Sequence, residues 1–203
     1  MATSTPRTKA RATESARRRE IIEAATEVFA QKGIVAATVR DIGERTGILS
    51  GSLYHHFSSK EEMIVEILVP VLRRQIEVFD AIVAETEDPD EILGRLIVAA
   101  VHQTAANPHV ARIVQNETLR LRELALDAVT SLQTEIMARW SSAVTQGVAA
   151  GRFRADVDPR VAALSIADVV LGAYRFMKPM GRMSANQVAA QLSALILRGL
   201  DTR

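Results

Sequence analysis

Cysteine is absent from the 203-residue chain, and aromatic side chains make up only 4% of it. Without cysteine the protein has no disulfides and no thiol chemistry. No apolar run reaches the ~18 residues that a membrane-spanning helix needs. Residues 1–15 also lack the apolar core of a signal peptide. These absences favour a soluble protein of the cytoplasm, with no membrane partner.

The usual signatures of catalysis and of cofactor binding are also missing. The histidines at positions 55, 56, 102 and 109 show no metal-binding spacing. There is no glycine-rich phosphate loop and no G-x-S-x-G nucleophile motif. The acidic clusters at 61–62 and 85–88 are typical of solvated surfaces. We therefore expect no enzyme, no catalytic residue, no cofactor and no metal.

Strand signals are lacking too, because the chain has no sustained alternation of apolar and polar residues and no Asn-Gly turn. Apolar residues recur instead at helical spacing, beginning with a helix from about Glu14 to Lys32 that Gly33 ends. Later helices are predicted at Lys60 to Glu85 with a kink at Pro70, at Asp88-Pro89 to Ala106, through Val114, at Glu117 to Val148, at Asp158-Pro159 to Met177, and from Ser184 onward. The prediction is an all-α fold of about nine helices.

Residues 38–63, TVRDIGERTGILSGSLYHHFSSKEEM, predict a helix, a tight turn, a second short helix and the start of a third. Thr38 and Asp41 have the spacing of a capping box. Gly43 is small enough for two helices to approach closely, and Gly47 supplies the positive φ of a sharp turn, which Ile48 and Leu49 would anchor. This layout is that of a helix-turn-helix, which places a helix in the major groove of DNA.

The second short helix would have one buried and one exposed face. Leu53 and Phe57 are spaced to face the core. With Ser50 as the cap, small polar residues then remain outside, where they can approach base edges and phosphates. Lys60 lies in the first turn of the next helix, against the helix dipole, which a nearby phosphate would explain. The alternative is a small helical hairpin with a structural glycine turn, in which Tyr54 and His55 are ordinary helix residues; His56 fits a packing role.

The same residues resemble a known family. T-V-R-D-I-x-x-x-x-G, S-L-Y-H-H-F and S-K-E-E-M, with R-R-x-E-I-I-E-A-A-x-E-V-F-A-Q-K-G-I before them, are similar to the DNA-binding domain of TetR-family transcriptional repressors, over about a quarter of the chain. The resemblance implies phosphate contacts from Thr38 and Arg40 and backbone contacts from His55 and Lys60. It also implies that Ser50, Gly51, Ser52 and Tyr54 enter or flank the major groove.

Charge is distributed unevenly. Residues 1–60 hold 10 Lys/Arg and 6 Asp/Glu, whereas residues 61–203 hold 15 and 18. A basic arm that includes Arg7 and Arg11 could follow phosphates or enter the minor groove. An ordinary disordered N-terminus is the alternative. For Arg17 to Arg19, inside or near the first helix, we expect at least one phosphate contact. We place the DNA-binding domain at 1–60 and a second helical domain at 61–203.

The last two helices are very apolar: residues 161–174 carry one charge in fourteen. Burial in a monomer core would explain this, but reading a palindrome requires a twofold dimer. The resemblance implies a four-helix interface built from these helices of two subunits. The expected interface residues are Ala163, Ala167, Leu171, Val188, Leu192 and Leu195.

The family resemblance further implies that the second domain encloses a small-molecule site whose ligand releases the DNA. The candidate lining residues are His102, Gln115, Asn116, Trp140, Tyr174, Arg175, Phe176 and Met177. Trp140 and Phe176 could equally be core residues, and His102 a hydrogen-bonded helix histidine. Arg175 could pair with an anionic ligand or form an interface salt bridge.

The DNA-binding segment also resembles that of the actinobacterial TetR-type regulators that control steroid and fatty-acid breakdown and respond to acyl-CoA thioesters. The expected function is a ligand-responsive repressor that binds a palindromic DNA operator as a homodimer, with an acyl-CoA or another amphipathic catabolite as effector. One alternative is an architectural DNA-binding protein or activator without ligand control; another is a pure interaction module.

Overall fold

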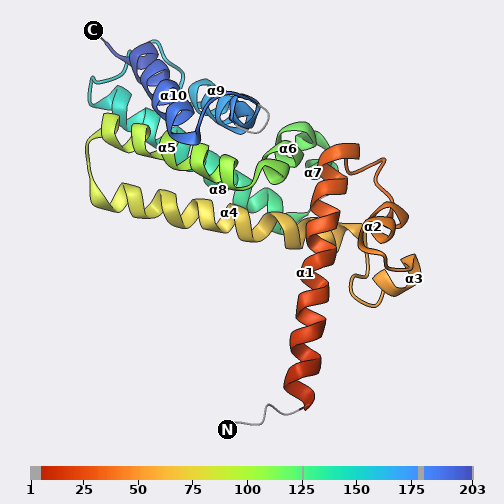
Figure 1. Cartoon of the computed structure of the whole chain (residues 1–203). Coiled ribbons are helices and arrows are strands. Elements are labelled where there is room, and N and C mark those ends of the chain that lie inside the picture. Colours follow the sequence, from red (N-terminus) through yellow and green to blue (C-terminus); the bar gives the residue numbers. More distant parts are fainter. Residues whose placement is uncertain (1–5, 125, 178–180, 203) are drawn as a thin grey trace. The chain divides into compact units, whose positions relative to one another are not determined.

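The computed structural model describes residues 6–124, 126–177 and 181–202. Over these ranges the chain forms ten α-helices, one short 3₁₀ helix and no β-strand (Figure 1). The all-α prediction is confirmed. The chain divides into two compact units, residues 1–67 and 68–203, and the division falls inside α4 (Lys60–Glu85). The sequence had placed it between residues 60 and 61.

The first unit contains α1 (Pro6–Lys32), α2 (Val39–Thr46), α3 (Ser50–Leu53) and the start of α4. Helix α1 begins at Pro6 rather than at Glu14, so residues 6–13 extend this helix instead of forming a separate arm. Residues 1–5 of the expected arm lie outside the described residues. The side chains that fill the core of this unit are Ile21, Ala25, Phe29, Ile42, Leu53, Phe57, Met63 and Ile64.

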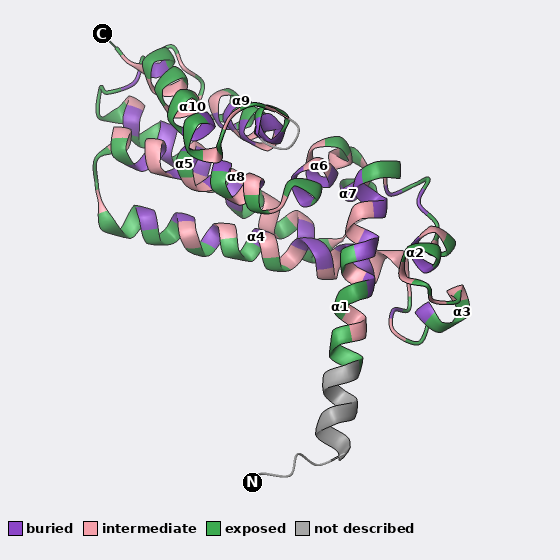
Figure 2. Cartoon of the chain, viewed as in Figure 1, coloured by how far each residue is buried: buried purple, intermediate pink, exposed green. Residues whose placement is uncertain are grey.

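In the second unit, α5 (Pro89–Ala106) is the central helix. It packs against α6 (Pro108–Asn116), α8 (Asp127–Ala149), α9 (Pro159–Gly172) and α10 (Ala185–Leu200). Burial along α5 follows this position (Figure 2). Leu93, Leu96, Ile97 and Val101 are fully buried, as expected of a helix covered on several sides.

Helix boundaries in this unit follow local chemistry. The carboxylates of Asp88 and Asp158 cap α5 and α9, each followed by proline in the first turn. Ser184 caps α10 and forms a capping box with Gln187. Gly151, with φ 68°, follows the end of α8. The predicted helix starts at Asp88-Pro89, Asp158-Pro159 and Ser184 are confirmed.

Two predicted boundaries were wrong. The helix expected from Glu117 to Val148 is divided into α7 (Thr118–Glu123) and α8. No glycine or proline marks this break, and Leu121 and Val129 on its two sides are both fully buried, so packing rather than local propensity sets it. Helix α9 ends at Gly172 and continues as the 3₁₀ helix η1 (Ala173–Phe176). Within α4, the chain stays helical through Pro70. Of the interval between the helix predicted to end at Met177 and the one predicted to begin at Ser184, residues 178–180 lie outside the described residues.

The closest approach in the first unit is at Gly43. A Cβ built there would lie 2.6 Å from the carbonyl oxygen of Ile48. Alanine is a better helix former than glycine by roughly 1 kcal/mol, so any loss of stability in Gly43→Ala must come from this clash. We expect amide hydrogen exchange in residues 1–67 to accelerate about tenfold, which is ~1.4 kcal/mol.

Gly51→Ala is the matched control, because nothing lies within 4 Å of its Cβ position. Hydrogen–deuterium exchange read by mass spectrometry compares the two variants. Equal exchange in both would show that the approach at Gly43 is not a tight one.

Candidate functional site

The start of α2 is fixed by the predicted capping box. The hydroxyl of Thr38 accepts from the Asp41 amide at 3.1 Å, and the Thr38 amide donates to the Asp41 carboxylate at 2.9 Å. Lys32 Nζ lies 2.6 Å from the other carboxylate oxygen. The hydrogen bond from Lys32 and those from Thr38 lower the pKa of Asp41 to about 2. The end of α1 and the start of α2 are thereby tied together.

The turn after α2 follows the predicted geometry. Gly47 has φ 66°, in the left-handed region that glycine enters without strain. The Ile48 amide donates to the Gly43 carbonyl at 3.0 Å. Leu53 and Phe57 are buried as predicted and anchor the segment that follows the turn.

Helix α3 is a single turn, and its start differs from the prediction. Leu49, not Ser50, occupies the N-cap position, without a side-chain hydrogen bond. Ser50 is the first helical residue, because the Ser52 amide bonds back to the Leu49 carbonyl at 2.8 Å. Leu49 was expected to anchor the turn but is 82% exposed, while Ile48 is half-buried.

The remaining residues of this segment form an exposed polar face. Gly51, Ser52, Tyr54 and His55 are exposed, with Tyr54 at 57%, and Ser50 is half-buried at its edge. His56 is half-buried, as its expected packing role requires. A short scaffolded turn thus presents small polar groups and one aromatic ring to the surroundings.

The residues expected to contact phosphates have different surroundings. The hydroxyl and amide of Thr38 are both engaged with Asp41. Arg40 forms an ion pair with Glu44 at 2.9 Å on the surface of α2, with its side chain 82% exposed. Exposed pairs of this kind contribute little to stability, so Arg40 can leave Glu44 for another anion at low cost.

Lys60 has internal partners. Its Nζ donates to the carbonyl oxygens of Ile34 at 3.0 Å and of Ala37 at 2.8 Å. These two carbonyls belong to the connection between α1 and α2. Lys60 therefore lies in the first turn of α4 because it satisfies this connection, and no phosphate is needed to explain its position.

Arg18 is the most highly connected charge of the first unit. Its guanidinium donates to both carboxylate oxygens of Glu66, to Glu62 at 2.8 Å and to the backbone carbonyl of His56. Its Cζ lies 3.9 Å from the centroid of the Phe57 ring. One side chain of α1 thus holds the start of α4 and the end of the segment after α3.

The pKa shifts of Arg18 and Glu62 are consistent with a strong ion pair that holds α1 against α4. The Arg18 hydrogen bond, followed by those from Ser58, lowers the pKa of Glu62 to about 2. Hydrogen bonds to Glu66 in turn raise the pKa of Arg18. Arg17 pairs with Glu20, whereas Arg19 is exposed and has no ion pair within the described residues. Of the three arginines from which a phosphate contact was expected, Arg19 is the one left free.

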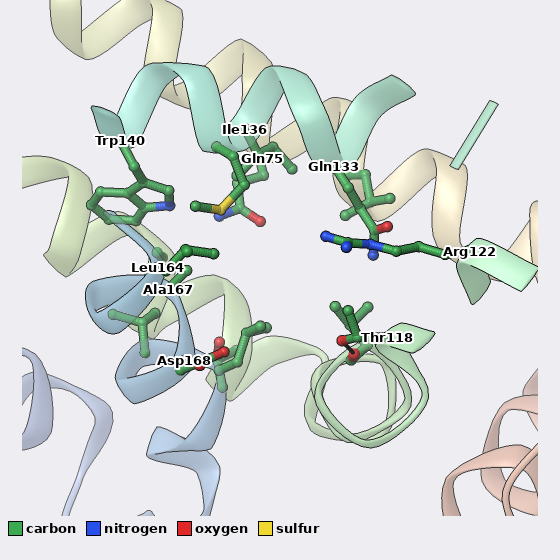
Figure 3. A pocket seen from close by; sticks show the side chains of 16 residues that line it. Gln75, Thr118, Arg122, Gln133, Ile136, Trp140, Leu164, Ala167 and Asp168 are labelled. Carbon is green, nitrogen blue, oxygen red and sulfur yellow. Dashed lines mark hydrogen bonds between the residues drawn. The ribbon is translucent and has the colours of Figure 1, made fainter. Parts of the chain in front are cut away.

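The second unit contains a partly open cavity of about 150 Å³ between α4, α5, α6, α7, α8 and α9 (Figure 3). Trp140 lies at one end and Arg122 at the other. The lining residues are Leu72, Gln75, Ala100, Thr104, Val114, Thr118, Arg122, Gln133, Ile136, Met137, Trp140, Leu164, Ala167, Asp168, Val170 and Leu171. We call this the inner cavity; it is largely apolar with a few polar groups, as ligand sites usually are.

A second cavity of about 570 Å³ adjoins it. It is lined by Arg122, Thr130, Gln133, Thr134, Met137, Ser141, Arg160, Ala163 and Leu164. We call this the outer cavity. Arg122, Gln133, Met137 and Leu164 line both cavities and form the boundary between them.

Of the residues predicted to line a ligand site, Trp140 alone lines the inner cavity, and it also packs edge-on against Phe79, 5.0 Å between ring centroids. His102, Asn116, Arg175 and Phe176 are exposed, Tyr174 and Met177 are buried, and Gln115 donates to the Asp168 carbonyl. Arg175 lies near the Tyr174 ring and lines neither cavity. The polar lining residues Gln75, Thr104, Thr118, Arg122, Gln133 and Asp168 were missed, because polar groups on amphipathic helices resemble a solvated face.

The expected interface residues divide into two groups. Ala163 and Val188 are buried within the single chain and offer no surface to a partner, whereas Ala167 is half-buried and lines the inner cavity. Leu171 and Leu192 are half-buried, and Leu195 is 68% exposed. A shallow apolar groove between α9 and α10 is lined by Ala162, Ser165, Ile166, Val169, Leu195, Ile196, Gly199 and Leu200.

Comparison with known families gives two matches. Residues 21–67 match the model for bacterial regulatory proteins of the tetR family, and residues 86–200 match the tetracyclin repressor-like C-terminal domain. The second match alone covers more than half of the chain. The protein belongs to the TetR family.

Individual relatives agree. The HTH-type transcriptional repressor KstR2 of Mycolicibacterium smegmatis is 37% identical over 92% of this chain and 91% of its own. The structure of the ketosteroid transcriptional regulator KstR2 of Mycobacterium tuberculosis superposes with a TM-score of 0.82 at 35% identity, over 92% of this chain and 96% of that one. FadR of Bacillus subtilis, solved with stearoyl-CoA, shares the fold at a TM-score of 0.67 and 21% identity, over 90% and 98% of the two chains.

As a TetR-family member, the chain is a DNA-binding transcriptional repressor and not an enzyme. The segment from Thr38 to Phe57 is its helix-turn-helix. Over the ranges that the structure describes, each helix is either too short or too polar to act as a membrane span.

Arg18 and Arg19 allow positioning to be separated from phosphate contact. In Arg18→Gln, the loss of the hydrogen bonds to Glu62, Glu66 and the His56 carbonyl should accelerate hydrogen exchange in residues 53–66. The salt dependence of binding to nonspecific duplex DNA should not change. Arg19→Gln should leave exchange unchanged and reduce the salt slope by about one, as expected for one lost phosphate contact.

Hydrogen–deuterium exchange and fluorescence anisotropy over a salt series measure these two effects. A reduced salt slope in Arg18→Gln, with unchanged exchange, would assign Arg18 to the DNA and contradict its positioning role.

Proposed function

We propose that the protein is a cytoplasmic homodimeric repressor that binds a palindromic operator through α2 and α3 and is released by a small-molecule effector in the second unit. The observation that carries the DNA-binding part is the exposed polar face at Gly51, Ser52, Tyr54 and His55 above the buried anchors Leu53 and Phe57. Such a face can enter a major groove without disturbing the core.

The contacts of this face follow from its chemistry. Ser50, Gly51 and Ser52 allow close approach to base edges, and the Tyr54 hydroxyl can bond a base or a phosphate. His55 and Arg40 would contact the backbone. Thr38 and Lys60 would add to backbone contact chiefly through the α2 terminus and the connection that they hold in place. Leu49, exposed beside the turn, can contact a thymine methyl group.

The dimer would form through the outer faces of α9 and α10. Val161, Val169 and Leu195 are exposed there although they are large and apolar. Exposed apolar patches of this kind usually mark interaction sites. Twofold pairing of the two helices would cover the groove between them and present two reading faces to the two halves of an inverted repeat.

The effector site would be the inner and outer cavities. A lined cavity supports a sensor over an architectural protein or an activator without ligand control. The ligand would bind the conformation with low DNA affinity more tightly, so ligand and DNA would each weaken the binding of the other by the same factor. An amphipathic catabolite such as an acyl-CoA suits a partly apolar, partly cationic lining.

Selection of the purified protein against random duplex DNA tests the proposed function. We expect an enriched inverted repeat, bound by one homodimer. Tyr54→Ala should lower the affinity for this operator about tenfold or more, by loss of one specific contact, while thermal unfolding stays unchanged. Phe176→Ala, which removes an exposed aromatic ring from the second unit, is the matched control. Failure to enrich any motif would refute sequence-specific regulation.

The dimer face has its own test. Leu195→Asp should give monomers in light scattering and abolish operator binding, because it buries a charge at the center of the proposed interface. Leu119→Asp introduces the same charge at a leucine that is 76% exposed on α7 and should leave the dimer intact. A Leu195→Asp protein that remains dimeric would show that another surface pairs the subunits.

A further inference from the structure

The outer cavity is lined by positively charged side chains, which a purely apolar ligand would not need. Two arginines, Arg122 of α7 and Arg160 of α9, line the same cavity, and no carboxylate lines it. Both side chains are exposed, and neither guanidinium forms a hydrogen bond or an ion pair within the described residues, so both are free to bind an anion that enters the cavity. Several other arginines of the second unit, such as Arg95, Arg139 and Arg152, have acidic partners.

Arg160 is exposed to water at a place where the helix dipole disfavours a cation. It is the second residue of α9, where its charge opposes the helix dipole. Lys60 occupies a comparable position in α4, but there two backbone carbonyls compensate for it. Arg160 has no such partner in the chain, and its side chain lines the outer cavity. An anion bound in this cavity would supply the missing countercharge.

Other groups of the outer cavity suit the same ligand. Thr130, Thr134 and Ser141 contribute hydroxyls, and Gln133 an amide, all from α8. Arginine and hydroxyl donors together are the usual partners of phosphate and carboxylate oxygens. Because Gln133, Thr134 and Ser141 follow Thr130 by three, four and eleven residues, the four donors share one face of α8 and face the same region of the cavity.

The inner cavity suits a different part of the same molecule. Its walls are largely apolar, with Trp140, Ile136 and Leu171 among them. At about 150 Å³ it is smaller than the ~300–1,000 Å³ of typical small-molecule sites, whereas the outer cavity, at about 570 Å³, lies within that range. A ligand of ordinary size would therefore extend across the boundary that Arg122 and Gln133 form. Figure 3 shows the Arg122 guanidinium directed into the inner cavity from this boundary.

We propose that the outer cavity is an anion-binding subsite in which Arg122 and Arg160 hold the phosphate or carboxylate head of an amphipathic effector, whose apolar body occupies the inner cavity. The proposal rests on the proposed effector control and names the chemistry of that site. Asp168, Thr104 and Gln75 in the inner cavity would then bind hydroxyl or keto oxygens on the apolar body, with Asp168 requiring a donor.

A pair of dyes tests the subsite on the protein alone. 8-Anilino-1-naphthalenesulfonate has an aromatic body and a sulfonate head, and N-phenyl-1-naphthylamine has the same body without the charge. In Arg122→Gln/Arg160→Gln, the affinity for the sulfonate dye should fall about tenfold or more, from the loss of two charge-assisted contacts, while the affinity for the neutral dye stays the same. Arg73→Gln, an exposed arginine of α4 outside both cavities, should change neither.

Two outcomes would overturn the subsite. Unchanged binding of the sulfonate dye to the double variant would show that the arginines bind no anion. An equal loss of both dyes would show that they only support the cavity wall. Neither measurement involves DNA, so failure of the subsite leaves operator binding intact, and failure of operator selection leaves the dye result readable.

Competitors identify the head group. Displacement of the sulfonate dye from the wild-type protein by octanoyl-CoA, but not by octanoate, assigns a phosphate-bearing thioester. Displacement by octanoate assigns a free carboxylate. In each case the double variant should resist displacement by the same compound, and displacement by neither compound would overturn the assignment to amphipathic acids and their thioesters.

Discussion

The geometry of the DNA-binding unit depends on one guanidinium. Arg18 reaches from α1 to two glutamates of α4 and to the backbone carbonyl of His56, and it covers the Phe57 ring. Helix α3 is a single turn without a side-chain cap, so its own hydrogen bonds hold it weakly. Its orientation must therefore come from outside, from the buried Leu53 and Phe57 and from the clamp that Arg18 forms behind them.

The helices of the second unit bury an apolar core and also leave a cavity that side chains do not fill. Polar residues on the inner sides of α4, α5, α7, α8 and α9 achieve this, because they line a cavity rather than pack against one another. At the outer side, the exposed arginines Arg122 and Arg160 line a half-open cavity to which no carboxylate contributes, so the positive charge there is not neutralised by the lining.

Much of the fold could be predicted from local chemistry. The capping residues Thr38, Asp88, Asp158 and Ser184, and the turn at Gly47, each act within a few residues, and the sequence shows them directly. The unpredicted features depend on distant partners. These include the break between α7 and α8, the carbonyls that bind Lys60, and the structural use of Arg18.

The candidate sites show the same division. The exposed polar face at Gly51, Ser52, Tyr54 and His55 was predictable because one short motif contains all its residues. In this segment the predicted cap of α3 and the predicted burial of Leu49 were wrong. The residues that line the inner cavity were not predictable, because a cavity between six helices is assembled from side chains that look like surface positions in each helix alone. In the same way, small residues such as Ala163 indicate close packing but not whether the neighbour is the same chain or another.

The exposure of Gly51, Ser52, Tyr54 and His55 has a consequence for evolution. Because these side chains are solvated and the core beneath them is formed by other residues, they can be exchanged with little effect on stability. Specificity for DNA can then drift through single substitutions while the scaffold stays constant. Gene duplication followed by such changes would give two regulators with the same effector chemistry and separate sets of target genes.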